Sequence, residues 1–205
     1  MSEKEKNLDR ILDFQKFMFE FSEIERLIYL PDGKKKDRKE NNIEHSYSLA
    51  MTAWYLSSSY PNLDKNLLIK YALIHDLVEI HAGDEQAVGR TKKAELAKAL
   101  REKEALKIIK EDWNDFPDAI KHMENYENKS DSESKFVYAL DKLMPLFLNL
   151  ISDGKTWKIY GFSQEDILAT KDSKIPLSPE INKLWQSFRE YVVQNLELFT
   201  LKTPK

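Results

Sequence analysis

The sequence predicts an all-α protein, a single-domain helical bundle. Three observations lead to this prediction. Over most of the chain, apolar residues recur at spacings of three and four, which places them on one face of a helix. Only 5 glycines and 7 prolines occur among 205 residues, which is few for a fold rich in tight turns. No segment shows a convincing strand pattern, and no internal repeat is present.

The composition is that of an ordinary globular protein. Charged residues make up 33% and hydrophobic residues 41%, and the net charge is −3 with both signs interspersed, so no nucleic-acid polymer is expected as a partner. The one basic run, 34–39, is either a solvated loop or a rim that attracts an anionic substrate. The absence of cysteine excludes disulfides and thiolate metal sites. No apolar stretch reaches the roughly 18 residues that span a membrane, so we expect a cytoplasmic protein.

The first half of the chain is expected to form three helices. We expect them over residues 7 to 29, from about 44 to 60, and from 62 or 64 to 83. The turn Pro31-Asp32-Gly33 ends the first helix, and a polar loop follows it through Asn42. The second helix stops before Pro61, and Gly83 ends the third.

The second half is expected to be helical as well. Helices are expected over 92–110, 116–126, 133–151, from 163 onward and over 180–198, with loops at 85–91 and 152–154 and an irregular stretch at 171–179. Ser163 and Asp166 have the spacing of a capping box, which marks a helix start. The apolar stripe of the last helix either closes the core or forms an interface in a homodimer.

The stretch from Ala72 to Asp84 carries chemistry on an apolar helix. With His75 set at zero, Glu79 falls at about 40° and Asp76 at about 100° around the helix. Apolar side chains fill most of the remaining surface. Because burying such groups costs several kcal/mol unless they are paired or bound to a cation, this sector needs a partner.

Two further polar residues lie on apolar helix faces. His45 shares a stripe with Leu49 and Leu56, and it is either a satisfied core histidine or a ligand. Asp141 shares a stripe with Met144 in a strongly apolar segment, and aspartate is rarely buried unless it is paired. Asp141 is therefore either a buried hydrogen-bonded carboxylate or a ligand.

Together these segments direct nitrogen and oxygen ligands inward from three helices. Two imidazoles and two carboxylates suit one first-row divalent metal ion. A site without thiolates that keeps open positions for water favours hydrolysis over a structural role. The chain contains neither His-Glu-x-x-His nor Glu-x-x-His, which argues against a zinc protease of that type and against a di-iron carboxylate bundle.

The order His45, His75-Asp76 and Asp141 on helices resembles the HD-domain phosphohydrolases. Within that family the chain resembles the group that contains the bacterial 5′-deoxynucleotidases and the eukaryotic HD domain-containing protein 2. The likeness covers roughly residues 10 to 160. The matching segments are 38–46, 75–84, 134–141 and 154–157.

This resemblance implies a role for seven residues. It implies four ligands for one divalent ion (Mn, Co, Fe, Ni, Zn or Mg): His45, His75, Asp76 and Asp141. Glu79 would orient or deprotonate the attacking water, and Asp84 would lie near the substrate sugar and its water network. Arg26 would grip the phosphate; without the resemblance it reads as a surface residue of the first helix. Leu27 stands where some of these nucleotidases have an aromatic residue against the sugar, and the loop 85–90 lacks their proline.

The expected function is that of a metal-dependent phosphohydrolase that converts nucleoside 5′-monophosphates, deoxy ones above all, to nucleoside and phosphate. Two alternatives stay open: a phosphodiesterase or pyrophosphohydrolase acting on nucleotides such as guanosine tetraphosphate, and a non-catalytic nucleotide-binding module. We expect one HD domain over 1–205, with a metal-binding core at about 10–160 and a helical extension at about 161–200. A homodimer is expected by analogy with relatives.

Overall fold

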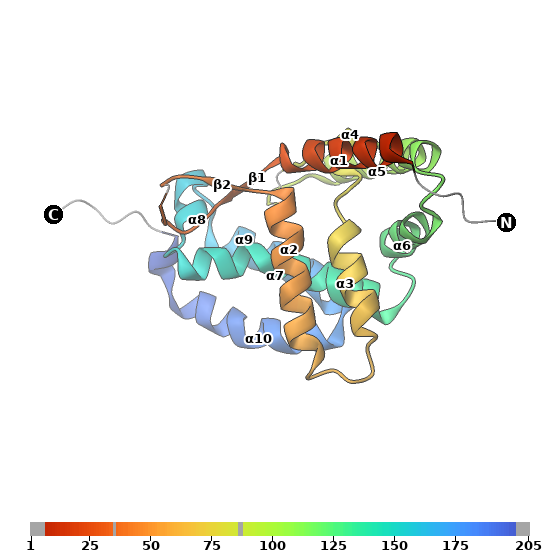
Figure 1. The fold of residues 1–205 in the computed structure, drawn as a ribbon. Coiled ribbons are helices and arrows are strands. Elements are labelled where there is room, and N and C mark those ends of the chain that lie inside the picture. The colour runs from red at the N-terminus through yellow and green to blue at the C-terminus, as the bar shows by residue number, and fades with distance from the viewer. Residues whose placement is uncertain (1–6, 35, 86–87, 200–205) are drawn as a thin grey trace.

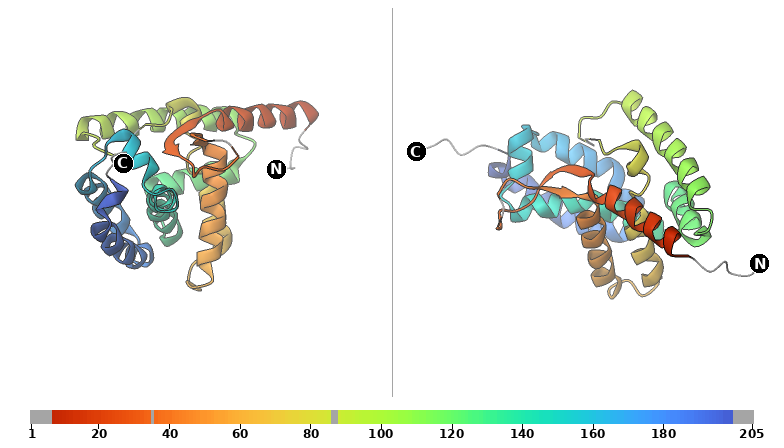
Figure 2. Two further views of the ribbon diagram at one scale, coloured as in Figure 1. Left: turned by 90° about the vertical axis from the view of Figure 1, so that its left-hand side faces the viewer. Right: turned by 45° about the horizontal axis from the view of Figure 1, so that its top comes forward.

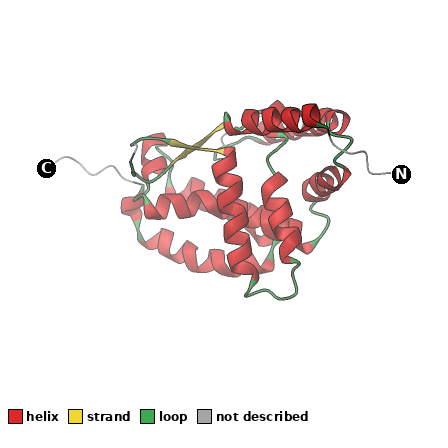
Figure 3. Cartoon of the chain, viewed as in Figure 1, coloured by secondary structure: helices red, strands yellow, loops and turns green. Residues whose placement is uncertain are grey.

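The computed structural model describes residues 7–34, 36–85 and 88–199, and these are mainly helical (Figure 1, Figure 3). Residue 35 of the basic run and residues 86–87 of the 85–91 loop lie outside the described residues. The elements are α1 (Leu8–Ser22), β1 (Glu25–Tyr29), β2 (Lys39–Asn41), α2 (Asn42–Ser57), α3 (Lys65–Ile74), α4 (Glu79–Ala82), α5 (Lys92–Asp112), α6 (Pro117–Asn128), α7 (Ser132–Ile151), α8 (Lys155–Tyr160), α9 (Gln164–Lys174), α10 (Pro179–Gln194) and two short 3₁₀ turns, Ile175–Leu177 and Leu196–Leu198. The predicted all-α class is confirmed, apart from one small hairpin.

Helix α7 runs through the centre of the molecule, and two hydrophobic cores form around it and beside it. In Figure 1, α2 and α3 stand side by side across α7, with α9 and α10 behind and below. Apolar residues of these five helices make the larger core, in which Leu140 of α7 is fully buried. The smaller core joins α1, α4 and α5, which lie together along the top of the view and remain one layer after it is turned (Figure 2). His75 and Asp76 lie in the chain between Ala72 of the larger core and Leu77 of the smaller core.

The predicted helix over 7–29 is wrong beyond Ser22. Residues 25–29 instead form β1, which pairs antiparallel with β2, Glu25 opposite Asn41 and Tyr29 opposite Lys39. The spacing of the apolar residues there fits either structure, and pairing with β2 satisfies the backbone of a short segment that ends near Pro31. Asn41 then caps α2 in a capping box, so α2 begins two residues before the predicted start.

The predicted continuous helix through Ala72–Asp84 is also interrupted. Helix α3 ends at Ile74, and α4 begins at Glu79. In between, the N–H of Leu77 donates to the Ile74 carbonyl and the N–H of Glu79 to the Asp76 carbonyl, so the bonds span three residues instead of four. Such a tightened stretch turns successive side chains differently from an α-helix, and segments of this kind are frequent at functional sites.

The C-terminal segment completes the larger core. The helix start at Ser163 is confirmed with its capping box, but α9 continues to Lys174, so most of the stretch predicted as irregular is helical. Helix α8 was not predicted. On α10, Ile181 and Trp185 are fully buried, which shows that this stripe closes the core. Among the described residues, no helix is both long and apolar enough to cross a membrane.

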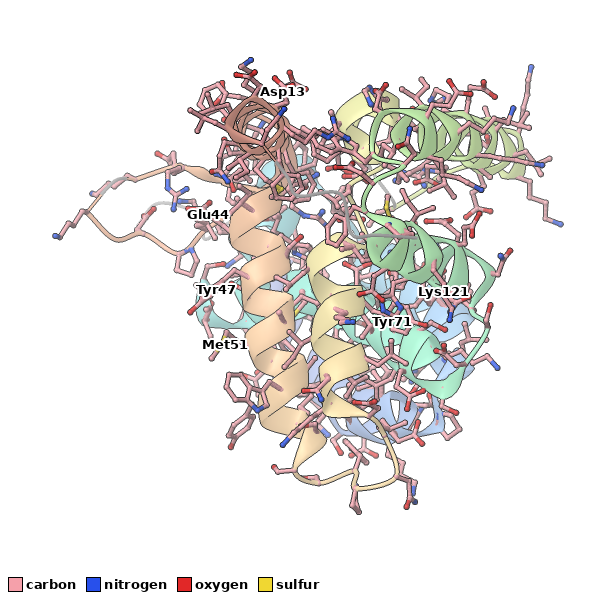
Figure 4. All side chains as sticks on the ribbon, turned by 45° about the vertical axis from the view of Figure 1, so that its right-hand side comes forward. Asp13, Glu44, Tyr47, Met51, Tyr71 and Lys121 are labelled. Atoms are coloured by element: carbon pink, nitrogen blue, oxygen red, sulfur yellow. The ribbon has the colours of Figure 1, made fainter. Side chains whose placement is uncertain are left out.

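The outer face of α2 differs from its inner face. In Figure 4, Tyr47 and Met51 point away from α3, and both are exposed. His45 and Leu49, on the other side of the same helix, have no exposed surface. Helix α2 therefore presents its ligand candidate to the interior, as the stripe of His45 and Leu49 predicts.

Candidate metal centre

Side chains from three parts of the chain meet beside a cavity of about 600 Å³, which His75, Asp76 and Asp141 line. His45 comes from α2, His75 and Asp76 from the end of α3, and Asp141 from the middle of α7. The ligand atoms of His45, His75 and Asp76 lie within 4.8 Å of one another. Asp141 Oδ1 lies 2.9 Å from His45 Nε2 and 3.8 Å from His75 Nε2. The four predicted ligands are therefore neighbours in space, although up to 96 positions separate them in sequence.

The hydrogen bonding of His75 indicates that a cation fits here. His75 Nδ1 lies 2.9 Å from the carbonyl oxygen of Ala72, which only accepts, so Nδ1 carries a proton and Nε2 is the ring nitrogen directed at the aspartates. His75 Nε2 is buried and has no hydrogen-bond partner, yet Asp76 Oδ2 is only 2.9 Å away. A ring nitrogen this close to a carboxylate oxygen needs a positive charge between the two atoms, either its own proton or a metal ion, and a nitrogen and oxygen donor set suits a divalent metal.

The charges around the centre keep both carboxylates ionised. Burial favours their neutral forms, but His75 and Arg26 hold the pKa of Asp76 well below its usual range. Lys142 and His45 do the same for the pKa of Asp141 against burial. Although burial lowers the pKa of His75, the two aspartates outweigh it and raise that pKa to about 10. Without a metal ion, the aspartates thus attract any available positive charge.

The comparisons with known proteins agree with this geometry. The HD domain family model matches residues 26–185, more than three quarters of the chain. The chain belongs to the HD domain family. It is 32% identical to human 5′-deoxynucleotidase HDDC2 over 109 residues, 51% of this chain and 50% of that protein, and 30% identical to the Danio rerio protein of the same name over 138 residues, 66% of each. The chain thus matches about half the length of the first of these relatives.

A solved structure shares the whole fold. It is the crystal structure of a predicted metal-dependent phosphohydrolase from Magnetospirillum magnetotacticum, with a TM-score of 0.71 at 24% identity. The alignment covers 93% of this chain and 99% of that one. The helical arrangement of this HD domain, including the C-terminal helices, is therefore that of a known fold.

In this HD domain, Arg26 projects from β1 into the cavity, so its interpretation as a surface residue of a helix is wrong. Its Nη1 donates to Asp76 Oδ2 at 2.7 Å and to Asn42 Oδ1 at 3.1 Å. Its Nη2 lies 3.9 Å from Asp141 Oδ1. The guanidinium therefore lies against both carboxylates of the candidate metal centre.

Glu79 is buried beside the centre and held at both oxygens. Asn42 Nδ2 donates to its Oε2 at 2.9 Å, and Lys98 Nζ donates to its Oε1 at 3.0 Å. Burial raises the pKa of Glu79 to about 7, with Asp76 and Asp84 adding to the effect and Lys98 opposing it. A carboxyl group of this kind exchanges a proton near neutral pH. Asp84, the other predicted site residue, lines the same cavity from the loop after α4.

Four residues around the centre were not predicted from the sequence: Glu40, Asn42, Lys98 and Lys142. Glu40 is buried, and its Oε2 lies 3.2 Å from His45 Nδ1. Lys142 Nζ lies 2.5 Å from Asp141 Oδ2. A signal for Lys98 exists, because it precedes the buried Ala105 by seven residues and so lies on the same face of α5. Asn42 precedes the buried Leu49 by the same seven residues, but it was predicted to lie in the loop before the helix. Glu40 gives no such signal, since it lies on β2 of the hairpin.

Proposed function

We propose that this HD domain is a metal-dependent phosphomonoesterase that hydrolyses nucleoside 5′-monophosphates, including deoxy ones, to nucleoside and phosphate. The observation that supports the proposal is the clustering of the ligand atoms of His45, His75 and Asp76 within 4.8 Å of one another, beside Asp141. The substrate class is supported by the name that the human and zebrafish relatives carry, 5′-deoxynucleotidase.

The four proposed ligands are His45, His75, Asp76 and Asp141. A divalent ion held by them supplies charge stabilisation for a phosphate oxygen and lowers the pKa of water. Hydrolysis of a phosphomonoester needs little else than a positioned nucleophile and compensation of the negative charge in the transition state. We assign the proton transfer and the binding of the phosphate to side chains around the centre.

Glu79 is the proposed base. Asn42 and Lys98 each hold one carboxylate oxygen of Glu79, which fixes its orientation toward the cavity. Because burial brings its pKa to about 7, Glu79 accepts a proton from the attacking water near neutral pH and releases it after the reaction. Its ordinary pKa would make it a weaker base.

Arg26 is the proposed phosphate-binding residue. Its guanidinium lies against Asp76 and Asp141, so a phosphate group at the metal centre meets its N–H donors. A planar guanidinium matches two phosphate oxygens at once, which a lysine does not do. Its Nη1 also donates to Asn42 Oδ1 at the start of α2, which helps to orient the side chain.

The nucleoside is proposed to lie in the rest of the cavity. A volume of about 600 Å³ is in the range of small-molecule sites. Leu27 and Asp84 both line it, and we propose that Asp84 accepts a hydrogen bond from a sugar hydroxyl. The side chain of Leu27 offers an apolar surface to the sugar where some nucleotidases have an aromatic ring.

The test is a phosphate-release assay on the purified chain with Mn²⁺, Co²⁺, Zn²⁺ or Mg²⁺ against a panel of nucleotides. We expect free phosphate from nucleoside 5′-monophosphates and none after the metal is removed with a chelator. Turnover of diesters or guanosine tetraphosphate alone would replace the proposal by a phosphodiesterase or pyrophosphohydrolase. Tight nucleotide binding without turnover by any metal would indicate a non-catalytic module.

A further inference from the structure

A group of buried and half-buried lysines on α7 and α9 lines the same cavity. It consists of Lys142, Lys171 and Lys174, which we name the lysine wall. Lys171 is the most buried of the three, with 7% of its surface exposed. On α9 it follows Ile167 by four residues and precedes Ile175 by four, and both isoleucines belong to the larger core. A lysine on a core stripe is rare unless its charge has a partner.

The three lysines differ in their partners. Lys142 Nζ lies 2.5 Å from Asp141 Oδ2, and Lys174 Nζ lies 3.7 Å from Glu95 Oε1. Lys171 Nζ donates to the backbone carbonyl of Lys142. Within the described part of the chain, Lys171 has no carboxylate at salt-bridge distance. The most buried ammonium of the wall is thus the one without a counter-charge.

The environment of Lys171 disfavours its charged form. Burial lowers its pKa from 10.5 to about 7, and the neighbouring charge of Lys142 adds to this effect. Burial also lowers the pKa of Lys174, and the charge of Lys142 lowers it further. Carboxylates compensate Lys142 and Lys174, so the charged form of Lys171 is the one that needs a further anion.

A purely structural role accounts for only part of this arrangement. The bond from Lys171 to the Lys142 carbonyl joins α9 to α7 close to Pro145, which cannot donate to the carbonyl four residues before it. A neutral donor would make that bond without the cost of burying a charge. The grouping of three lysines around one cavity, with one unpaired, indicates a negatively charged ligand.

We propose that the lysine wall binds a second phosphate group, so that the cavity accepts small molecules carrying two phosphates, such as nucleoside diphosphates. One phosphate would lie at the metal centre and the other against Lys171. This inference rests on the proposed function for the first phosphate only. The second phosphate needs its own donors because Arg26 serves the metal centre from β1, while Lys171 belongs to α9 and contacts none of the four proposed metal ligands. Ammonium groups are strong donors to phosphate oxygens.

The test uses inorganic phosphate as the probe and the full chain with and without metal. In ³¹P NMR or calorimetric titrations, we expect the metal-free chain to bind one phosphate and the chain loaded with one equivalent of Co²⁺ to bind two. Lys171→Met should weaken binding to the metal-free chain by about 10-fold, the lower range for one hydrogen bond between charged groups. In the Co²⁺-loaded variant, one phosphate should remain.

The control is Lys183→Met, which removes the same charge from an exposed position of α10 and should change neither titration. If Lys171→Met does not fold, Lys174→Met should weaken phosphate binding to the metal-free chain instead, by a smaller factor. No phosphate binding to the metal-free chain, or binding that Lys171→Met and Lys174→Met leave unchanged, overturns the proposal. Failure of the metal centre is distinguishable, because it removes only the phosphate that depends on Co²⁺.

Discussion

Two parts of the cavity lining, the metal centre and the lysine wall, adjoin each other at Asp141 and Lys142 but favour ligands of opposite charge. At the metal centre, the buried His75 Nε2 lies 2.9 Å from the carboxylate of Asp76, and this pair of donor atoms suits a cation. At the lysine wall, the buried ammonium of Lys171 contacts only a carbonyl and calls for an anion. The charges around them are paired, as Asp141 is with Lys142 and Glu79 with Lys98. The comparison shows that the unpaired groups, more than the number of charges, indicate where ligands bind.

The largest effect is expected at the metal centre, from Glu79→Gln. The amide cannot accept the proton of the attacking water, so kcat should fall by about 10²- to 10⁴-fold. The metal content, measured by mass spectrometry of the purified protein, should stay the same because Glu79 is no proposed ligand. Glu104→Gln on the exposed face of α5 is the matched control. Full activity of Glu79→Gln would remove Glu79 from the mechanism.

The next effect is the contribution of Lys171, in the lysine wall, to the pH dependence of protein stability. The folded-state pKa of Lys171, about 7, lies below the value of 10.5 expected in the unfolded chain. Between these values the unfolded chain binds more protons, so the free energy of unfolding should rise as pH increases from about 7 to 10.5, by a few kcal/mol at most. Below pH 7 the cost of the buried charge is fully present.

Lys171→Met should remove this dependence. In phosphate-free buffer without metal, the variant should be more stable than the wild type at pH 6, and the difference should shrink toward pH 10. Thermal unfolding monitored by circular dichroism measures both chains. Parallel curves for the two chains over this range would show that Lys171 is not buried in its charged form.

A smaller effect is expected from Glu40→Gln, which removes the carboxylate charge beside His45 at the metal centre. Glu40 Oε2 lies 3.2 Å from His45 Nδ1, and carboxylates behind a metal-bound histidine typically contribute about 10- to 100-fold in metal affinity. Competition with a chromophoric chelator measures that affinity without any turnover. Glu25→Gln, an exposed change on the same hairpin, is the control. Equal affinities of the two variants would mean that Glu40 does not orient His45.

The smallest effect is expected from Lys98→Met, which tests how far the ion pair with Lys98 sets the pKa of Glu79. Lys98 lowers the pKa of Glu79 against burial, so its removal should raise that pKa. The acid limb of the pH–activity profile should then move toward higher pH by about 1 pH unit, because Glu79 must be deprotonated to act. An acid limb at the wild-type position would assign it to another group.

The groups at the metal centre could be predicted from the sequence because they interrupt apolar helix stripes. His45 and Asp141 occupy apolar stripes of regular helices, and a polar residue in such a stripe indicates a buried partner. The prediction that α2, α3 and α7 direct these groups inward follows from helix periodicity alone. Their assignment as ligands of one ion remains a prediction that metal analysis has to test.

The same reasoning missed residues whose position depends on tertiary structure. The strand that carries Arg26 reads equally well as the end of a helix, and only its pairing with β2 decides between the two. Lys171 was missed because its segment was predicted as irregular; with α9 extended to Lys174, the stripe Ile167, Lys171 and Ile175 carries the same signal as His45. The break after Ile74 has no local signature, since the surrounding residues are good helix formers.

The most direct test of the central claim is a crystal structure of the chain loaded with Mn²⁺, with the ion located by anomalous scattering. We predict one strong peak in direct contact with His45 Nε2, His75 Nε2 and carboxylate oxygens of Asp76 and Asp141. A peak that contacts none of these side chains, or only one of them, would contradict the account.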